Sequence, residues 1–199
     1  MNIRNRLIGA ATLALLAQTP QSALAADWWV IFGTGDSPER DMFYADALSV
    51  AEQRRGSGET EAPRSVGVVQ VLESAEAPNF VHYSMQFQCR QRLVKFDGIT
   101  AYMRSNTPSN LASPQGWKPV PQSWVDRAYT FACDAQNREG NAMLRIGNTT
   151  ADVLAQVTRT QIWGLTTPAA YDQAPGAVRN GTDGVMRDLD ILLGNPPKR

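Results

Sequence analysis

Residues 80–89 read FVHYSMQFQC, and this stretch decides the fold more than any other part of the chain. Apolar residues occupy the odd positions from 81 to 87, and polar residues occupy the even positions from 82 to 88. Alternation with a period of two is typical of an antiparallel strand that has one buried face. The stretch therefore predicts a half-buried strand over 80–88 that leads directly into Cys89.

Other segments around it have a strand-like composition, rich in aromatic and β-branched residues: 27–32, 42–46 and 65–72. Asp97-Gly98 lies between two further apolar runs, and such a pair favours the tight turn of a hairpin. Residues 104–117 are rich in Ser, Asn, Pro and Gly, so we expect a long loop there.

The periodicity changes after residue 121. Ser123 is a good N-cap, and Trp124, Ala128 and Phe131 then recur at helical spacing. This pattern predicts a helix of about three turns over residues 122–132. Strands followed by one amphipathic helix indicate an α+β fold, in which an antiparallel sheet carries a helix on one face.

The first residues have the pattern of a signal peptide. Two arginines precede an apolar run over residues 7–17, which is too short to span a membrane. Small residues then predict cleavage between Ala25 and Ala26. We expect residues 1–25 to be removed and the mature chain to be periplasmic or secreted. It has no expected transmembrane segment and no lipid anchor, because no cysteine lies near the cut.

The chain contains two cysteines, Cys89 and Cys133. Thiols pair in the oxidising compartment that an exported protein enters, so we predict a disulfide that pins the helix to the sheet. Such a bridge closes a loop of about 45 residues and is worth on the order of 4 kcal/mol in the chain-entropy model. The alternative is two buried cysteines that do not pair.

The charge balance argues against a nucleic-acid partner. Loss of residues 1–25 leaves 17 basic residues against 19 acidic ones, a net charge of −2, whereas a nucleic-acid binder has a basic excess on one face. Arg90, Arg92 and Lys95 form a local basic cluster. We interpret it as a solvated sheet face, with an anion site as the alternative.

No catalytic constellation emerges from the residue types. His82 is the only histidine, and Ser84 on the same strand face lies about 7 Å away, too far for a hydrogen bond. We therefore expect a surface histidine. Too few ligands remain for zinc, and the acidic residues at 36–41 lack the spacing of a calcium loop. We predict no catalytic residue, no metal and no cofactor.

Four short elements, taken in order, resemble one known family. They are Trp28-Trp29-Val30, FYADALSV over 43–50, FQCRQRL over 87–93, and WKPVPQS over 117–123 leading to Cys133. Residues 28–133 are similar in these places to the bacterial surface-adhesin protein E domain. The resemblance implies a sheet with a helix held on one face by the disulfide. It also implies a non-catalytic binding role. Adhesins of that family carry a lipid on a cysteine that this chain lacks, and the chain continues for 66 residues past Cys133.

These observations predict three segments: the signal peptide 1–25, an adhesin-E-like domain over 26–139, and an extension over 140–199 packed on that domain. Within the extension we expect mixed or helical structure, with a helix starting near 149–152, a strand or helix over 158–163, and a short helix over 182–193. Trp28 and Trp29 point to opposite faces of their strand. One should be core, and the other should be an exposed contact or lie under the extension.

Two functions remain open after this reading. The first is an exported, non-catalytic binding module of the cell envelope with an unknown protein partner, met through a sheet face or an exposed edge. The second is a periplasmic enzyme or small-ligand-binding protein with a site between the sheet and the extension. A deep pocket lined by convergent polar groups would favour the second function.

Overall fold

The computed structural model describes residues 25–105 and 107–165. The signal-peptide residues 1–24 and the short helix expected over 182–193 lie outside these ranges. The strands are β1 (Ala26–Thr34), β2 (Asp41–Asp46), β3 (Ala51–Glu52), β4 (Arg64–Leu72), β5 (Phe80–Gln88), β6 (Leu93–Tyr102), β7 (Pro108–Leu111), β8 (Lys118–Pro119) and β9 (Leu144–Thr149). The helices are η1 (Ala47–Ser49), α1 (Trp124–Cys133), α2 (Ala151–Val157) and η2 (Thr158–Ile162).

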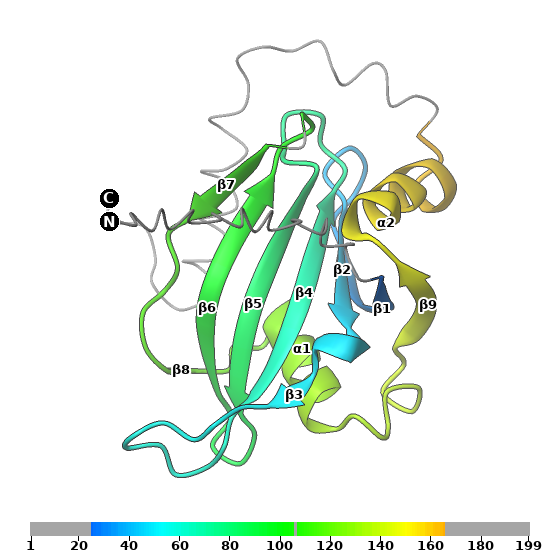
Figure 1. Cartoon of the computed structure of the whole chain (residues 1–199). Coiled ribbons are helices and arrows are strands. Elements are labelled where there is room, and N and C mark those ends of the chain that lie inside the picture. Colours follow the sequence, from blue (N-terminus) through cyan, green and yellow to red (C-terminus); the bar gives the residue numbers. More distant parts are fainter. Residues whose placement is uncertain (1–24, 106, 166–199) are drawn as a thin grey trace, which may run out of the picture.

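All described strands belong to one antiparallel sheet. Its order is β7-β6-β5-β4-β2-β1-β9, with β3 also paired to β4 and β8 also paired to β6 (Figure 1). Most neighbours in the sheet are also neighbours in the sequence, as short reversing connections require. The strand predicted over 80–88 is β5, which lies between β4 and β6. An antiparallel sheet with few helices is confirmed.

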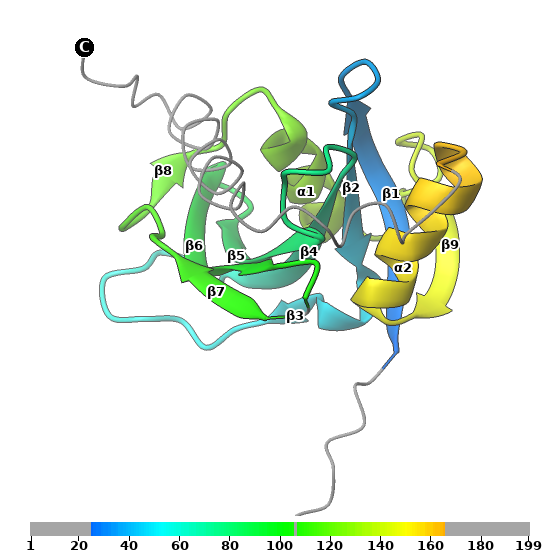
Figure 2. The same cartoon turned by 90° about the horizontal axis from the view of Figure 1, so that it is seen from above.

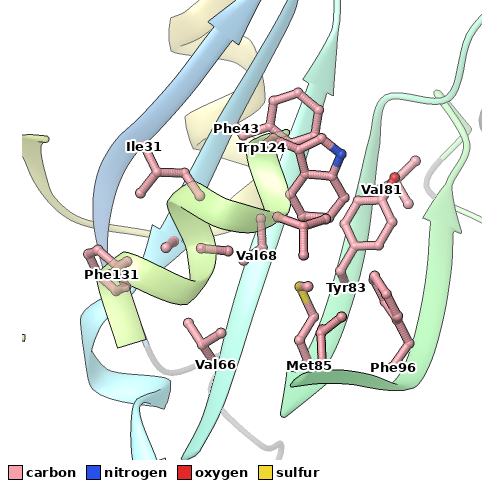
Figure 3. Close-up of a cluster of buried hydrophobic side chains, with 14 of the residues drawn as sticks. Ile31, Phe43, Val66, Val68, Val81, Tyr83, Met85, Phe96, Trp124 and Phe131 are labelled. Carbon is pink, nitrogen blue, oxygen red and sulfur yellow. The ribbon is translucent and has the colours of Figure 1, made fainter. Parts of the chain in front are cut away.

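Helix α1 covers one face of the sheet. Ser123 caps it, since the Ser123 Oγ accepts a hydrogen bond from the Val125 N–H at 3.2 Å, and Asp126 lies in the first turn. The inner face of α1 carries the buried residues Trp124, Val125, Ala128, Phe131 and Ala132. Figure 3 shows Trp124 and Phe131 pointing from the helix toward the strands, where the Trp124 indole stacks on the Phe43 ring with centroids 4.7 Å apart.

Helix α2 lies beside β1 and β9 and away from α1 (Figure 2). It contributes Leu154 and Ala155 to a second cluster on the sheet. Trp28 belongs to this cluster and is 4% exposed, whereas Trp29 packs at the α1 side, where its ring meets Phe131 edge-on. The two tryptophans therefore point to opposite faces, and it is Trp28 that the segment after residue 140 covers.

The hairpin expected at Asp97-Gly98 is wrong. Strand β6 runs straight through this pair, because Gly98 pairs with Ser84 and Phe96 pairs with Met85, which leaves Asp97 as the extra residue of a bulge. The Asp97 carboxylate accepts a hydrogen bond from the Gln86 side chain at 2.6 Å. The long ladder with β5, together with shorter pairing to β7 and β8 on the other side of β6, outweighs the local turn preference. The chain reverses instead before β6, where Arg92 has a φ of 53°.

Two other expectations need adjustment. The segment 104–117 is not all loop, because β7 lies within it and pairs with β6. Residues 158–162, for which strand and helix were both open, form the π-helix η2 directly after α2. The helix predicted to start near 149–152 is α2.

Candidate functional site

Cys89 and Cys133 form the predicted disulfide, with Cα atoms 5.7 Å apart. Cys89 follows β5 and Cys133 is the last residue of α1, so the bridge connects a strand end to a helix end. Tyr129 adds a second link at this place, because its hydroxyl donates to the Cys89 carbonyl oxygen at 2.7 Å. The expected cleavage position, between Ala25 and Ala26, falls immediately before β1.

His82 is half-buried rather than fully exposed. A Cβ placed on Gly67 would lie 3.2 Å from the His82 Nε2 and 3.4 Å from the Ser49 Oγ, so the absence of a side chain at Gly67 makes room for both groups. Burial lowers the pKa of His82, and the charge of Asp46 opposes this shift. The imidazole is therefore neutral at physiological pH.

Ser49 is the neighbour of His82 that sequence reasoning missed. It comes from η1, which folds back over β4, and no spacing in the sequence indicates this approach. The Ser49 hydroxyl donates to the Asp46 carbonyl oxygen at 2.7 Å and accepts from the Gly67 N–H at 2.8 Å. The hydroxyl proton is already hydrogen-bonded to a backbone carbonyl oxygen, so Ser49 is not arranged as a nucleophile that a base activates.

A cavity of about 420 Å³ lies at one end of the sheet. It is lined by the β1–β2 turn, by the connection after β4 and by Leu165, and three acidic residues face it: Glu39, Glu73 and Glu76. This is the place where the second candidate function would have its site. Among the described residues, no group of three or more His, Cys, Asp or Glu side chains is arranged to hold a metal ion.

The pKa of Glu73 at this cavity is strongly lowered, and the surroundings of its side chain account for the shift. Its side chain is 2% exposed and receives hydrogen bonds from the Arg40 guanidinium at 2.6 and 2.8 Å and from the Ser37 hydroxyl at 3.0 Å. The Arg40 side-chain bonds lower the pKa of Glu73 to about 2 against the opposing effect of burial. Glu73 is therefore an ionised anchor for Arg40 and has no proton to donate near neutral pH.

Arg159 and Thr158 attach the segment after β9 to the sheet. The buried Arg159 guanidinium donates to the Leu72 carbonyl oxygen at 2.8 Å and to the Asn79 side chain at 2.5 Å. The Thr158 hydroxyl donates to the Leu154 carbonyl oxygen, so the hydrogen bond of 2.7 Å between Thr158 Oγ1 and the Tyr44 hydroxyl has Tyr44 as its donor. Polar contacts of this kind in a buried setting fix α2 and η2 in one position.

The basic cluster does not lie on one sheet face as expected, because Arg90 and Arg92 lie in the turn between β5 and β6 and Lys95 lies in β6. Each cation has an acidic neighbour: Glu61 at 3.9 Å for Arg90, Asp126 at 2.6 Å for Arg92, and Asp97 at 3.3 Å for Lys95. These carboxylates already occupy the positions that an anionic ligand would take. The cluster is therefore a poor anion site.

The two edges of the sheet differ in character. Strand β7 begins with a proline and exposes Pro108, Ser109 and Asn110, features that protect an edge from pairing with other strands. Strand β9, within the described residues, pairs only with β1, and it exposes Leu144 and Ile146, which are 65% and 39% exposed. β9 is therefore the apolar edge of the molecule.

A second cavity, of about 330 Å³, lies between Trp29 and the loop over residues 135–140. Arg138 lies at this cavity with its guanidinium carbon 3.8 Å from the centre of the Phe131 ring and 5.8 Å from that of Trp29. Sequence reasoning did not single out Arg138, because a lone arginine in a polar loop carries no pattern.

Comparison of the chain with protein-family models, curated proteins and solved structures found no match. The resemblance to surface-adhesin protein E therefore stays a prediction from the four sequence elements. Along the described part of the chain, no helix has the length and apolar character to cross a membrane.

Proposed function

We propose that this chain is an exported, non-catalytic binding module of the cell envelope that meets a protein partner through the free edge of β9. The observation that carries the proposal is the apolar character of this edge, where Leu144 is 65% exposed at the start of a strand side that no described strand pairs with. An added strand gains main-chain hydrogen bonds from such an edge, and side chains at alternate positions supply specificity.

Two features of β9 favour a specific partner over indiscriminate aggregation. Ile146 is the extra residue of a bulge, because Gly147 pairs with Trp28 and Arg145 pairs with Trp29. Arg145 also forms an ion pair of 2.9 Å with Asp27. Bulges and charges protect an edge against indiscriminate pairing, so a partner strand at β9 has to accommodate both.

The rest of the proposal follows the signal-peptide pattern and the segments predicted from the sequence. Residues 1–25 direct export to the periplasm or beyond and are cleaved before Ala26. The disulfide holds α1 on the domain over 26–139, and the extension over 140–199 packs on that domain. Intact-mass measurement of the exported protein is expected to give the 174-residue form. A mass that retains the leader would contradict the export step.

A photo-cross-linking residue at position 144 tests the β9 edge directly. Leu48 supplies a matched control, since it is 66% exposed but lies in η1 and not on the sheet edge. Envelope and extracellular fractions are then irradiated with each variant. We expect a discrete cross-linked protein with the residue at 144 and none at 48. The same adducts from both positions, or from neither, would contradict the proposal.

The second candidate function, a small-ligand protein or enzyme, has one observation in its favour. The 420 Å³ cavity is bounded by the sheet and by Leu165, and Glu39 and Glu76, the two acidic residues other than the Arg40-paired Glu73, suit a cationic ligand. Native mass spectrometry of the exported protein tests it. A bound small molecule that is lost when Ala75→Trp fills the cavity would support this function over the first.

A further inference from the structure

Three arginines within the described residues stack on aromatic rings, and they differ in their hydrogen-bond partners. Arg40 lies 5.4 Å from the ring centre of Trp163, Arg92 lies 4.6 Å from that of Tyr129, and Arg138 lies 3.8 Å from that of Phe131. A ring face stabilises a cation but offers no acceptor for its N–H groups. The hydrogen-bond partners of each guanidinium therefore decide what it does.

Two members of the set have a carboxylate within the protein. Arg40 binds Glu73 and Arg92 binds Asp126, each with a shortest separation of 2.6 Å. These carboxylates raise the pKa of Arg40 and of Arg92 above the ordinary value. A planar guanidinium that is stacked and paired in this way has its preferred partners in place.

Arg138 is the exception. The hydrogen bond that its guanidinium makes within the described residues runs from Nε to the Phe131 carbonyl oxygen at 3.3 Å, and the four N–H groups on its two Nη atoms have no acceptor there. Burial lowers the pKa of Arg138, and the charge of Asp27 only partly offsets this. Asp27 is itself engaged, because its carboxylate accepts from Arg145 at 2.9 Å.

The loop that carries Arg138 is held in place on both sides. The Arg127 guanidinium donates to the Asn141 carbonyl oxygen at 2.6 Å, and the Asn141 side chain donates to the Asp134 carboxylate at 3.0 Å. The disulfide at Cys133 precedes the loop and the buried Met143 follows it. The cavity wall is therefore formed before any ligand arrives, which reduces the entropy lost on binding.

We propose that the 330 Å³ cavity beside Trp29 binds the carboxylate or phosphate group of a small molecule, with Arg138 as the residue that recognises it. An oxyanion there accepts N–H bonds from the two Nη atoms. In the other two arginines, Glu73 accepts from Nε and Nη2 of Arg40, and Asp126 accepts from Nη2 of Arg92. Trp29 supplies an apolar wall for the body of the ligand. Glu139 also lines the cavity, and its exposed charge opposes anion binding. This inference is independent of the β9 edge.

Titration of the mature, disulfide-bonded protein followed by nuclear magnetic resonance tests the proposal. Inorganic phosphate and benzoate are the two probes, and the Trp29 indole N–H and the Arg138 amide are the signals. We expect saturable shifts with at least one probe. Saturation by phosphate alone assigns a phosphate ligand, and saturation by benzoate alone assigns a carboxylate with a flat apolar body.

Three variants make the test specific to Arg138. Arg138→Gln is expected to weaken binding at least about tenfold, because the bidentate donor is lost. Arg92→Gln, the matched control with its own carboxylate, is expected to bind like the unchanged protein. Glu139→Gln removes an opposing charge at an exposed position and is expected to tighten binding about threefold. Because Glu139 is exposed, the Glu139→Gln variant still tests the site if Arg138→Gln fails to fold.

Several results would overturn the site. Shifts that never saturate with either probe would show that no defined site exists. Equal affinity in Arg138→Gln, or an equal loss in Arg92→Gln, would show that binding is a general effect of basic residues. Unchanged or weaker binding in Glu139→Gln would place the anion elsewhere.

Discussion

Replacing Cys89 and Cys133 together by alanine measures what the bridge contributes to the free energy of unfolding. The two residues are 44 positions apart in the sequence. A cross-link that closes a loop of about 45 residues lowers the entropy of the unfolded chain by an amount worth about 4 kcal/mol at 25 °C. We expect the free energy of unfolding of the double variant to be lower by most of this amount.

The fold should survive the loss under mild conditions. Helix α1 keeps its five buried side chains, and the Trp124 ring remains stacked against Phe43. Domains of this size are commonly stable by about 5–15 kcal/mol, so a loss of about 4 kcal/mol leaves most of that range folded. The Tyr129 hydroxyl also retains its bond to the carbonyl oxygen of residue 89.

Guanidinium denaturation, followed by tryptophan fluorescence and circular dichroism, gives the measurement. The reduced but otherwise unchanged protein serves as the control, because it separates the bridge from the packing of the cysteine side chains. We expect the double variant and the reduced protein to agree. A loss below about 1 kcal/mol in both would refute the reasoning, since it would mean that the unfolded chain is not constrained by the bridge.

Glu73→Gln should make the free energy of unfolding less dependent on pH in the acid range. The pKa of Glu73 is lowered to about 2 from 4.5, chiefly by Arg40, so the stability that the Glu73 carboxylate contributes is full above pH 4.5 and is lost as the pH falls toward 2. An unchanged acid profile in urea melts would contradict this. Tyr44→Phe should lower the free energy of unfolding by about 1 kcal/mol, and Thr158→Val should lower it more, because Val leaves the buried Tyr44 hydroxyl without an acceptor. A larger loss in Tyr44→Phe than in Thr158→Val would contradict this hydrogen-bond assignment. His82→Gln should lower the free energy of unfolding by about 1 kcal/mol or less at pH 8, because the imidazole is half-buried. Because burial lowers the pKa of His82, the unchanged protein should lose stability below pH 6.5 and the variant should not; equal slopes would rule this out.

The sequence was most informative where one local signal and the tertiary environment agree. The alternation over 80–88 predicted β5 because this strand has a buried side against α1 and a polar side away from it. Ser123 predicted the start of α1 because its side chain can satisfy an N–H of the first turn only if the helix begins there. The disulfide followed from the number of cysteines and the export signal together.

Prediction failed where distant contacts override a local preference. Asp97-Gly98 has the composition of a hairpin turn, yet pairing with β5 on one side and β7 on the other makes a continuous strand with a bulge more favourable. The approach of Ser49 and His82 to Gly67 depends on how η1 folds over β4. No periodicity in the sequence encodes such an approach.

The candidate sites were harder to predict than the fold, for a physical reason. A charge cluster in the sequence is visible, but its carboxylate partners come from other elements, as Asp126 of α1 does for Arg92 of the β5–β6 connection. Arg138 is inconspicuous in the sequence, and its importance arises only from the two aromatic rings beneath it and the cavity beside it. Which cation lacks a partner is a property of the folded chain.

This distinction bears on the choice between binding and catalysis. Catalysis by general acid or base requires a group that exchanges a proton near neutral pH and reaches a reacting atom. Glu73 is held ionised by Arg40, and the Ser49 hydroxyl is bound to backbone groups, so neither has that freedom. The groups that do keep capacity for a new contact, the Nη atoms of Arg138 and the outer edge of β9, offer hydrogen bonds and apolar surface. Such groups can recognise a ligand or a partner without changing it, and both proposals rest on this capacity.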